Sequence, residues 1–494
     1  MKNKNSKYIM IGVISIVLIY ALFLNPIKEY LRKYTDVIEN KDIDDNNYID
    51  GSKNELPIPE LLEDKNPDEN IANFTLEPQE GKTSFSDNKE TDTMGYNGSF
   101  LGPVIRVHRG EKVSIHVKNK LDEATTLHWH GLEVDGENDG GPNQGIQPGS
   151  TWEPSFTINQ PAATLWYHPH FIGSTATQVY KGLAGLFYID DEVSNSLNIP
   201  KEYGVNDIPL IIQDRSFNKS GGFIYHTNMM DGAVGDTILI NGSISPYLDV
   251  KTEKVRLRIV NGANASNFHL KLSNNDEFYQ IASDGGFLET PVKLNNIFLS
   301  PGERAEIIAD FSNYKVGTKI ELRNNNKSIM TFNINEKVED KTEVPISLTS
   351  INRMISDSAT KERKFELRGM GHMVSINGEE FNMNTINEVG KYGETEMWTV
   401  TNPATMMHSM GHPFHIHGIQ FQVLTRNGKE PNQVLTRNGK EPKLEEMGWK
   451  DTVFINPNEE VKIIVKFNNI GSYMYHCHIL EHEEEGMMGQ IKIE

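Results

Sequence analysis

Residues 475–482 of this 494-residue chain read YHCHILEH and contain its only cysteine, Cys477. Because successive side chains of a β-strand point to opposite faces, His476 and His478 are expected on one face and Cys477 on the other. Met487 follows shortly after. With the last histidine of the stretch and a more distant one, the thiolate and thioether form the ligand set of an electron-transfer copper site. Zinc is the alternative, although a structural zinc site usually uses more than one cysteine.

Half of the 16 histidines occur in pairs with the spacing His-x-His. The four pairs stand in the contexts LHWHG, LWYHPH, HPFHIHG and MYHCH, and are His128/His130, His168/His170, His415/His417 and His476/His478. Random placement would produce roughly half of one such pair, so the excess is clear. On a strand, each pair presents both imidazoles to one side. Eight converging imidazoles indicate a cluster of several metal ions. His412 is expected to turn toward Cys477.

In these motifs and their order, the sequence resembles the multicopper oxidases, and within them the bacterial copper efflux oxidase and laccase-like group. Other stretches that carry the resemblance are MGYNGSFLGPVIRVHRGE, LEVDGENDGGP, QPAATLWYHPH, KGLAGLFYI, ASDGG and GWKDTV. The resemblance extends from about Leu56 to Glu494. It implies an all-β fold of three cupredoxin-like Greek-key β-sandwich domains.

The resemblance also implies four copper ions. The matching ligand positions are His412, Cys477, His482 and axial Met487 for a blue (type 1) copper, His128 and His415 for a type 2 copper, and His130, His168, His170, His417, His476 and His478 for a type 3 pair. Asp139 and Glu483 match family acids that supply protons on two sides of the cluster. Every ligand position is filled, which favours an active enzyme.

The implied reaction is one-electron oxidation of a small reductant coupled to four-electron reduction of dioxygen to water. Cuprous ion and phenols are the expected substrates, with a role in copper tolerance. Three alternatives are a general laccase or ferroxidase without that role, a non-catalytic copper-binding or surface-assembly protein, and a copper nitrite reductase. The last would have fewer domains and would not need two extra histidine pairs.

The substrate site is the least defined part. Thioethers favour cuprous ion, and the chain has soft side chains near the blue-copper position, which are Met370, His372, Met373, Met407, His408 and Met410. In the family a carboxylate stands where this chain has His408, and the family's long Met-rich segment is short here. The alternative is that these methionines are packing residues. The other unpaired histidines are interpreted as ordinary side chains: His108, His116, His226 and His269.

Length and turn-rich β patterns predict three domains, at residues 56–191 (first region), 192–341 (middle region) and 342–494 (last region). The middle region holds no histidine pair and is expected to act as a spacer. The net charge of −20 disfavours nucleic acid as a partner. A monomer is expected.

The N-terminus predicts a location. Lysines precede an apolar run, Tyr8–Leu24, without a small-residue cleavage site. Residues 1–27 are therefore expected to form a signal anchor that leaves the enzyme outside the cytoplasm, with a cleaved signal peptide as the alternative. Residues 28–55 form an acidic linker expected to be disordered.

A tandem duplication stands in the last region. Residues 422–432 read QVLTRNGKEPN and residues 433–442 read QVLTRNGKEP. Either copy contains an Asn-Gly turn that suits a hairpin. The expectation is that the extra copy extends from the surface without affecting metal binding.

Overall fold

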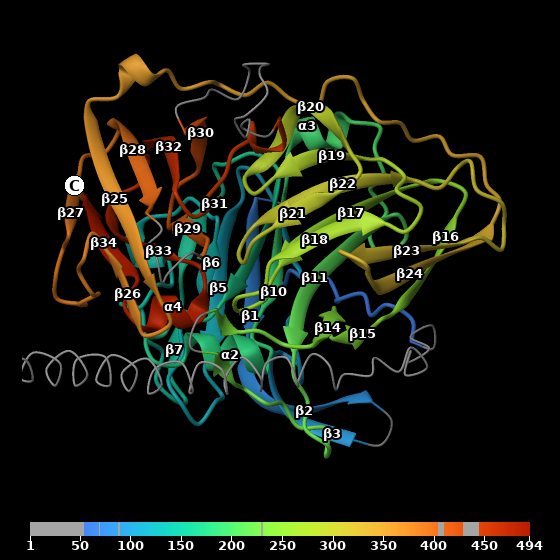
Figure 1. Cartoon of the computed structure of the whole chain (residues 1–494), viewed down its shortest axis with the longest axis horizontal. Helices are drawn as coiled ribbons and strands as arrows, with labels where there is room; N and C mark the ends of the chain where they lie inside the picture. The colour runs from blue at the N-terminus through green and yellow to red at the C-terminus, as the bar shows by residue number, and fades with distance from the viewer. Residues whose placement is uncertain (1–53, 69, 87–88, 229–230, 404–409, 428–443) are drawn as a thin grey trace, which may run out of the picture. The chain divides into compact units, whose positions relative to one another are not determined.

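The computed structural model describes residues 54–494, apart from residues 69, 87–88, 229–230, 404–409 and 428–443. The predicted anchor, linker residues 28–53, Met407, His408 and most of the duplication lie outside the described residues. Among the described residues, no helix is long and apolar enough to cross a membrane. β-strands dominate, as Figure 1 shows, so the mainly β architecture expected from the sequence is confirmed.

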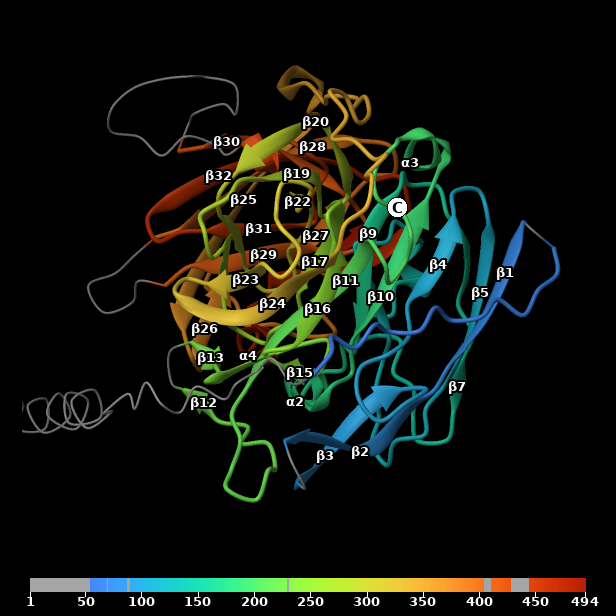
Figure 2. The same ribbon diagram turned by 90° about the vertical axis from the view of Figure 1, so that its right-hand side faces the viewer.

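The first region forms two sheets, with the orders β1-β5-β7 (β8 also pairs with β5) and β4-β10-β9-β6, and a separate β2–β3 hairpin (Figure 2). Its strands are β1 (Ile71–Leu76), β2 (Pro78–Ser86), β3 (Lys89–Tyr96), β4 (Ile105–His108), β5 (Lys112–Lys118), β6 (His128–His130), β7 (Thr151–Trp152), β8 (Ser155–Thr157), β9 (Ala163–His168) and β10 (Gly185–Asp190). Strand β5 shows why these residues form a sheet. Val113, Ile115 and Val117 are buried between exposed or half-buried neighbours, the alternation of a strand with one face on a core.

The middle region contains a seven-stranded sheet, β15-β14-β11-β17-β22-β19-β20, a five-stranded sheet, β16-β24-β23-β18-β21, and a small β12–β13 pair. Its strands are β11 (Asp207–Arg215), β12 (Thr227–Asn228), β13 (Gly232–Ala233), β14 (Thr237–Ile240), β15 (Ser243–Ile244), β16 (Tyr247–Lys251), β17 (Lys254–Asn261), β18 (Phe268–Leu272), β19 (Phe278–Ser283), β20 (Gly286–Leu294), β21 (Ile297–Leu299), β22 (Arg304–Asp310), β23 (Lys319–Asn324) and β24 (Lys327–Glu336). Isoleucine, leucine and phenylalanine side chains from both large sheets pack into one core between them.

The last region has two five-stranded sheets, β26-β25-β28-β32-β30 and β27-β34-β33-β29-β31. Its strands are β25 (Lys361–Met370), β26 (Met373–Ile376), β27 (Glu388–Gly390), β28 (Thr395–Asn402), β29 (His412–Ile416), β30 (Phe421–Arg426), β31 (Thr452–Ile455), β32 (Glu459–Lys466), β33 (Gly471–Cys477) and β34 (Met488–Ile493). The described helices are short: α2 (Thr175–Lys181), α3 (Glu192–Ser196), α4 (Leu480–Glu484), and the 3-10 turns η2 (Gly136–Asn138), η3 (Ser356–Ser358) and η4 (Leu444–Glu446).

Direct contacts join the first and last regions, which are far apart in the sequence. The Gly136 amide donates to the Ile470 carbonyl at 2.9 Å, and the Tyr473 hydroxyl donates to the Val134 carbonyl at 2.9 Å. Helices α2 and α4 also meet, and the Ala176 amide donates to the Glu484 carboxylate at 2.9 Å. These contacts place β6 and β9 close to β29 and β33.

Candidate metal centre

The four histidine pairs lie on or just after strands that the topology places together. Strand β6 pairs antiparallel with β9, so His128 lies opposite His168. Strand β29 pairs antiparallel with β33, so His415 lies opposite His476. All eight imidazoles are fully buried, and within each pair the ring centroids are 5.0–6.4 Å apart. We refer to these eight side chains as the imidazole cluster.

One group of three nitrogens in the cluster comes from His170, His417 and His476. The Nε2 atom of His476 is 3.1 Å from that of His417 and 3.3 Å from that of His170. Nitrogens bound to one ion at about 2.0 Å are separated by about 3.3–3.5 Å. This spacing therefore fits three ligands of a shared ion.

A second group has an unusual member. The Nδ1 atom of His130 is 3.4 Å from Nε2 of His168 and 3.2 Å from Nε2 of His478. In the first group all of the contacting nitrogens are Nε2. His130 therefore presents its other ring nitrogen, which requires the opposite tautomer.

His128 and His415 complete the cluster. The His128 ring stacks on His417 and the His415 ring stacks on His130, each with centroids 3.7 Å apart. Their Nε2 atoms are buried and have no hydrogen-bond partner among the described residues. A buried polar atom is nearly always paired, so two such nitrogens in one cluster fit the remaining metal-ligand positions.

Backbone carbonyls fix four of these eight rings through the outward-facing nitrogen. The Nδ1 atoms of His128, His168, His415 and His476 lie 2.8–3.0 Å from backbone carbonyl oxygens. A carbonyl only accepts, so each Nδ1 carries the proton and each Nε2 keeps its lone pair for a metal. Such outer contacts hold ligand imidazoles in place.

The cluster also favours neutral imidazoles. Burial lowers the pKa of the cluster histidines, and neighbouring imidazoles lower it further. The affected residues are His130, His168, His170, His415, His417, His476 and His478. A histidine binds metal in its neutral form, so these rings need not lose a proton first.

The cysteine faces a second, separate group. The Cys477 sulfur is 3.6 Å from Nδ1 of His412 and 3.7 Å from Nδ1 of His482, and Met487 is buried in the same core. Burial raises the pKa of the Cys477 thiol and, together with the nearby His482, lowers that of His412 to about 3. The thiolate that binds metal is therefore disfavoured here without a cation. We refer to these four residues as the Cys477 site.

Both predicted acids contact the imidazole cluster. The Asp139 carboxylate accepts from Nδ1 of His417 at 2.8 Å. The Glu483 carboxylate, on α4, lies 3.2 Å from Nδ1 of His476 and 3.4 Å from Nδ1 of His170. Burial raises the pKa of Glu483, and the neighbouring acids on α4 raise it further, which favours the protonated form.

The sequence interpretation missed Asp451 and Arg304. Asp451 Oδ1 lies 3.0 Å from Nε2 of His130 and forms a buried ion pair with Arg304. Burial alone would raise the pKa of Asp451, but Arg304 and His130 hold it well below its usual range. Asp451 lies in the stretch GWKDTV, which carries the family resemblance, but that stretch did not indicate a role for this residue. Arg304 carries no sequence signal because it belongs to the region without histidine pairs.

The soft residues are only partly described. Met370 is buried and Met373 is exposed, and they face each other across the β25–β26 hairpin. His372 is exposed and contacts the Glu485 carboxylate at 2.6 Å, and Met410 packs against the core that contains Cys477. Met407 and His408 lie outside the described residues, so the substrate site stays a prediction. The other four unpaired histidines, assigned no metal role, are all exposed.

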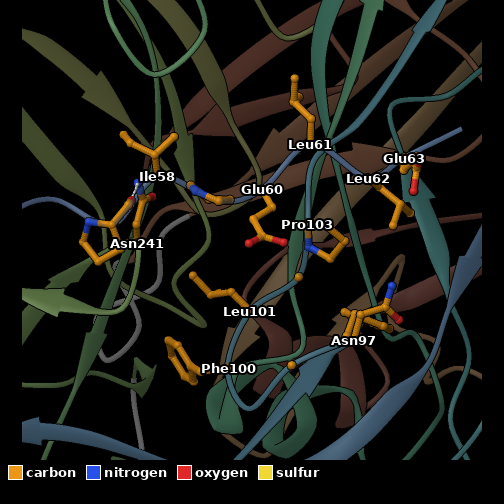
Figure 3. Close-up of a pocket in the computed structure, with 15 residues that line it drawn as sticks. Ile58, Glu60, Leu61, Leu62, Glu63, Asn97, Phe100, Leu101, Pro103 and Asn241 are labelled. Carbon is orange, nitrogen blue, oxygen red and sulfur yellow. Dashed lines mark hydrogen bonds between the residues drawn. The ribbon is translucent and has the colours of Figure 1, made fainter.

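A pocket of about 520 Å³ lies elsewhere, between residues 57–63 and residues 96–103 (Figure 3). Pro57, Glu60, Phe100 and Asn241 are among its lining residues. None of the predicted site residues lines this pocket.

Sequence comparisons agree with the geometry. Family profiles described as multicopper oxidase match residues 77–194, 206–346 and 343–494. The chain is 45% identical to "Multicopper oxidase mco" of Staphylococcus epidermidis, covering 94% of this chain and 99% of that protein. It is 33% identical to "Cell division protein FtsP" of Dickeya dadantii, covering 90% of this chain and 93% of that protein.

Solved structures show the same relationship. A laccase from Pediococcus acidilactici has a TM-score of 0.85 and 39% identity, covering 90% of this chain and 94% of that one. A bacterial laccase-like multicopper oxidase, CueO, from Ochrobactrum sp., described as active towards lignin model compounds, has a TM-score of 0.79 and 36% identity. It covers 89% of this chain and 100% of that one.

Proposed function

The chain belongs to the multicopper oxidase family, and from this premise we propose that it is an active oxidase. It takes electrons singly from cuprous ion or small phenols and reduces dioxygen to water. Copper tolerance is its proposed role in the cell.

The burial and spacing of the predicted ligands support the proposal. All twelve predicted ligand residues are described, and all are buried at or near zero exposure. The nitrogens of His170, His417 and His476 have the spacing of ligands that share one ion. The unpaired Nε2 atoms of His128 and His415 supply further donors.

Four copper ions fit these donors. The Cys477 site would hold the blue copper, with the thiolate of Cys477, the imidazoles of His412 and His482 and the thioether of Met487, a ligand set that suits electron transfer. The imidazole cluster would hold a type 2 copper at His128 and His415 and a type 3 pair at the other six histidines. When bound, the coppers supply the one-electron chemistry and the reduction of dioxygen.

The chain itself supplies connection and protons. Cys477 lies between His476 and His478 in the sequence, so a short stretch of one strand joins the Cys477 site to the imidazole cluster. Glu483, whose pKa burial raises, would hold a proton beside Nδ1 of His170 and His476. Asp139 would orient a different imidazole, that of His417, and would exchange a proton with it.

The substrate proposal rests on exposure and chemistry. Met373 and His372 are exposed on the β25–β26 hairpin, and Met410 lies beside the core that holds Cys477. Thioethers bind cuprous ion well. The similarity to proteins named as laccases supports phenol oxidation.

The proposed location is the outer side of the cell membrane, held by residues 1–27, or secretion if that segment is cleaved. Fractionation of cells followed by protease treatment tests this. Protection of the enzyme in intact protoplasts would contradict it.

The main experiment is the visible spectrum of the copper-loaded protein, with copper content and oxygen uptake. We expect four coppers per chain, an intense blue band and a near-ultraviolet shoulder from the type 3 pair. Cys477→Ser should remove the blue band and keep the shoulder, whereas the control His116→Gln, at an exposed histidine, should keep both. A colourless wild-type protein with full copper would overturn the proposal.

A second experiment tests the cuprous substrate. Replacing Met407 and Met410 by leucine should slow cuprous oxidation more than phenol oxidation. The control Met383→Leu changes an exposed methionine outside the predicted site. Equal loss on both substrates would contradict a cuprous site at these residues.

The similarity to FtsP favours one alternative, a non-catalytic protein of surface assembly. That reading does not need a complete ligand set, which this chain has. Oxygen uptake that is absent with every reductant, in protein with four coppers, would favour the alternative. A deletion strain with normal copper tolerance but lost phenol oxidation would instead indicate a general laccase.

A further inference from the structure

The middle region, expected to be a spacer, reaches the imidazole cluster. The turn between β21 and β22 contains Gly302, whose backbone has a φ of +86°. A Cβ at this position would lie 3.0 Å from Cγ and Cδ2 of His478 and 3.1 Å from Cε1 of His130. The turn therefore packs directly on two imidazoles that come from the first and last regions.

Arg304, two residues later, is buried and completely hydrogen-bonded. Its Nη1 and Nη2 donate to Asp451 Oδ1 and Oδ2 at 2.6 and 2.5 Å. The remaining donors reach the carbonyl oxygens of Thr164, Gly302 and Asp284 at 3.3, 3.0 and 2.9 Å. A guanidinium has five N–H groups, and all five are used, so its orientation is fixed.

Asp451, which Arg304 holds in place, contacts two imidazoles of the cluster. Its Oδ1 lies 3.0 Å from Nε2 of His130, and its backbone carbonyl accepts from Nδ1 of His415 at 2.9 Å. Gln420 Nε2 and the Thr452 hydroxyl also donate to the carboxylate, at 2.8 and 2.9 Å. The carboxylate is held from three sides and presents one oxygen to His130.

The contact with Asp451 determines the tautomer of His130. A carboxylate accepts, so Nε2 of His130 carries the proton and Nδ1 is left with the lone pair. Nδ1 is the nitrogen that faces His168 and His478. Backbone carbonyls fix four of the other cluster rings and the Asp139 carboxylate fixes His417, whereas His130 depends on a carboxylate that Arg304 holds.

We propose that Arg304, in the region without histidine pairs, is a positioning residue for the copper cluster. Through the bidentate pair with Asp451 it fixes the tautomer and orientation in which His130 offers Nδ1 to a type 3 copper. The inference rests on the proposed function, because it assumes that the cluster binds copper. Partners of this kind are worth about 10- to 100-fold in metal affinity.

The chain contains a matched control. Arg258 is also buried in the middle region and donates to both oxygens of Asp207, at 2.7 and 3.0 Å. Its described hydrogen bonds reach no predicted copper ligand. Replacing it breaks a buried ion pair of the same type, and its side-chain partners are Asp207, Thr164 and Glu306 rather than a predicted copper ligand or Asp451.

The experiment compares Arg304→Leu, Arg304→Lys and Arg258→Leu with wild type. Each is loaded with copper, titrated with a chelator, and followed by copper content, the near-ultraviolet shoulder and the blue band. For Arg304→Leu we expect the cluster coppers to leave at about 10- to 100-fold lower chelator concentration, with the blue band retained. Arg304→Lys should fall between, because lysine keeps the charge but not the fork of donors.

If Arg304→Leu and Arg258→Leu keep the near-ultraviolet shoulder equally well during the chelator titration, the inference is overturned. If Arg304→Leu does not fold, Arg304→Lys decides: a shoulder as stable as in wild type overturns the inference, and an earlier loss supports it. A wild-type protein without the shoulder would refute the proposed function instead, so the two failures are distinguishable.

Discussion

Gly302→Ala adds one methyl group where the middle region meets the imidazole cluster. The glycine has a φ of +86°, in the left-handed region, and the new Cβ would lie 3.0 Å from ring carbons of His478. The same atom would lie 3.1 Å from Cε1 of His130. The substitution therefore has a backbone effect and a contact effect.

The two effects have different sizes. An alanine in left-handed backbone costs about 1–2 kcal/mol in folding free energy. Carbon atoms pack at about 3.5–4.0 Å, so the rings or the turn must move by roughly 0.5 Å. Metal-ligand distances at a working site vary by only about 0.2 Å. The movement exceeds that tolerance, so we expect the type 3 pair to be lost.

A matched control isolates the contact effect. Gly317 is also in the middle region, with a φ of +92°, and a Cβ there would meet no described atom within 4 Å. Both alanine variants should lose about 1–2 kcal/mol in free energy of unfolding. Only Gly302→Ala should lose the near-ultraviolet shoulder and cluster copper, while both keep the blue band.

The assay is the ratio of the shoulder to the blue band, measured beside copper content and thermal unfolding. Equal ratios in the two variants would refute the reasoning, because the backbone strain that both variants share would then account for the whole effect on the cluster. Loss of the blue band in Gly302→Ala alone would also contradict it, since the effect would not be confined to the cluster.

Three further predictions follow from the same structure. Removing copper should lower the unfolding temperature, because a ligand at 100 times its dissociation constant contributes about 2.7 kcal/mol per site; calorimetry showing no shift would contradict this. Burial raises the pKa of Glu483 above its ordinary value of 4.5, so the folded state binds the extra proton and stability should fall as pH rises above about 4.5. Glu483→Gln should flatten that slope in the copper-free protein, and an unchanged slope would exclude the effect. Deleting residues 422–432 leaves Phe421 followed by an identical QVLTRNGKEP, so strand β30 should re-form; a product without blue colour would show that the duplication matters.

Much of the site could be predicted from local spacing. A strand alternates its side chains, so a His-x-His pair shares a face whatever the rest of the fold does. The registers of β6 with β9 and of β29 with β33 agree with this. The same alternation separates Cys477 from His476, and the structure places them in different groups.

Other parts could not be predicted because they depend on distance in space. Arg304 and Asp451 are 147 positions apart and meet as a fully buried pair. A single arginine or glycine in a β-rich region has no spacing that marks it. The tautomer of His130 is set by the group that lies beyond the ring, which no local pattern contains.

The amino-acid sequence by itself determined which residues can bind metal and which of them share a strand face, because ligand chemistry and side-chain alternation are local properties. The tertiary structure decided which pairs converge, which ring nitrogen each histidine presents, and that the region without histidine pairs contributes Gly302 and Arg304 to the cluster. Those properties depend on packing between strands that are distant in the chain.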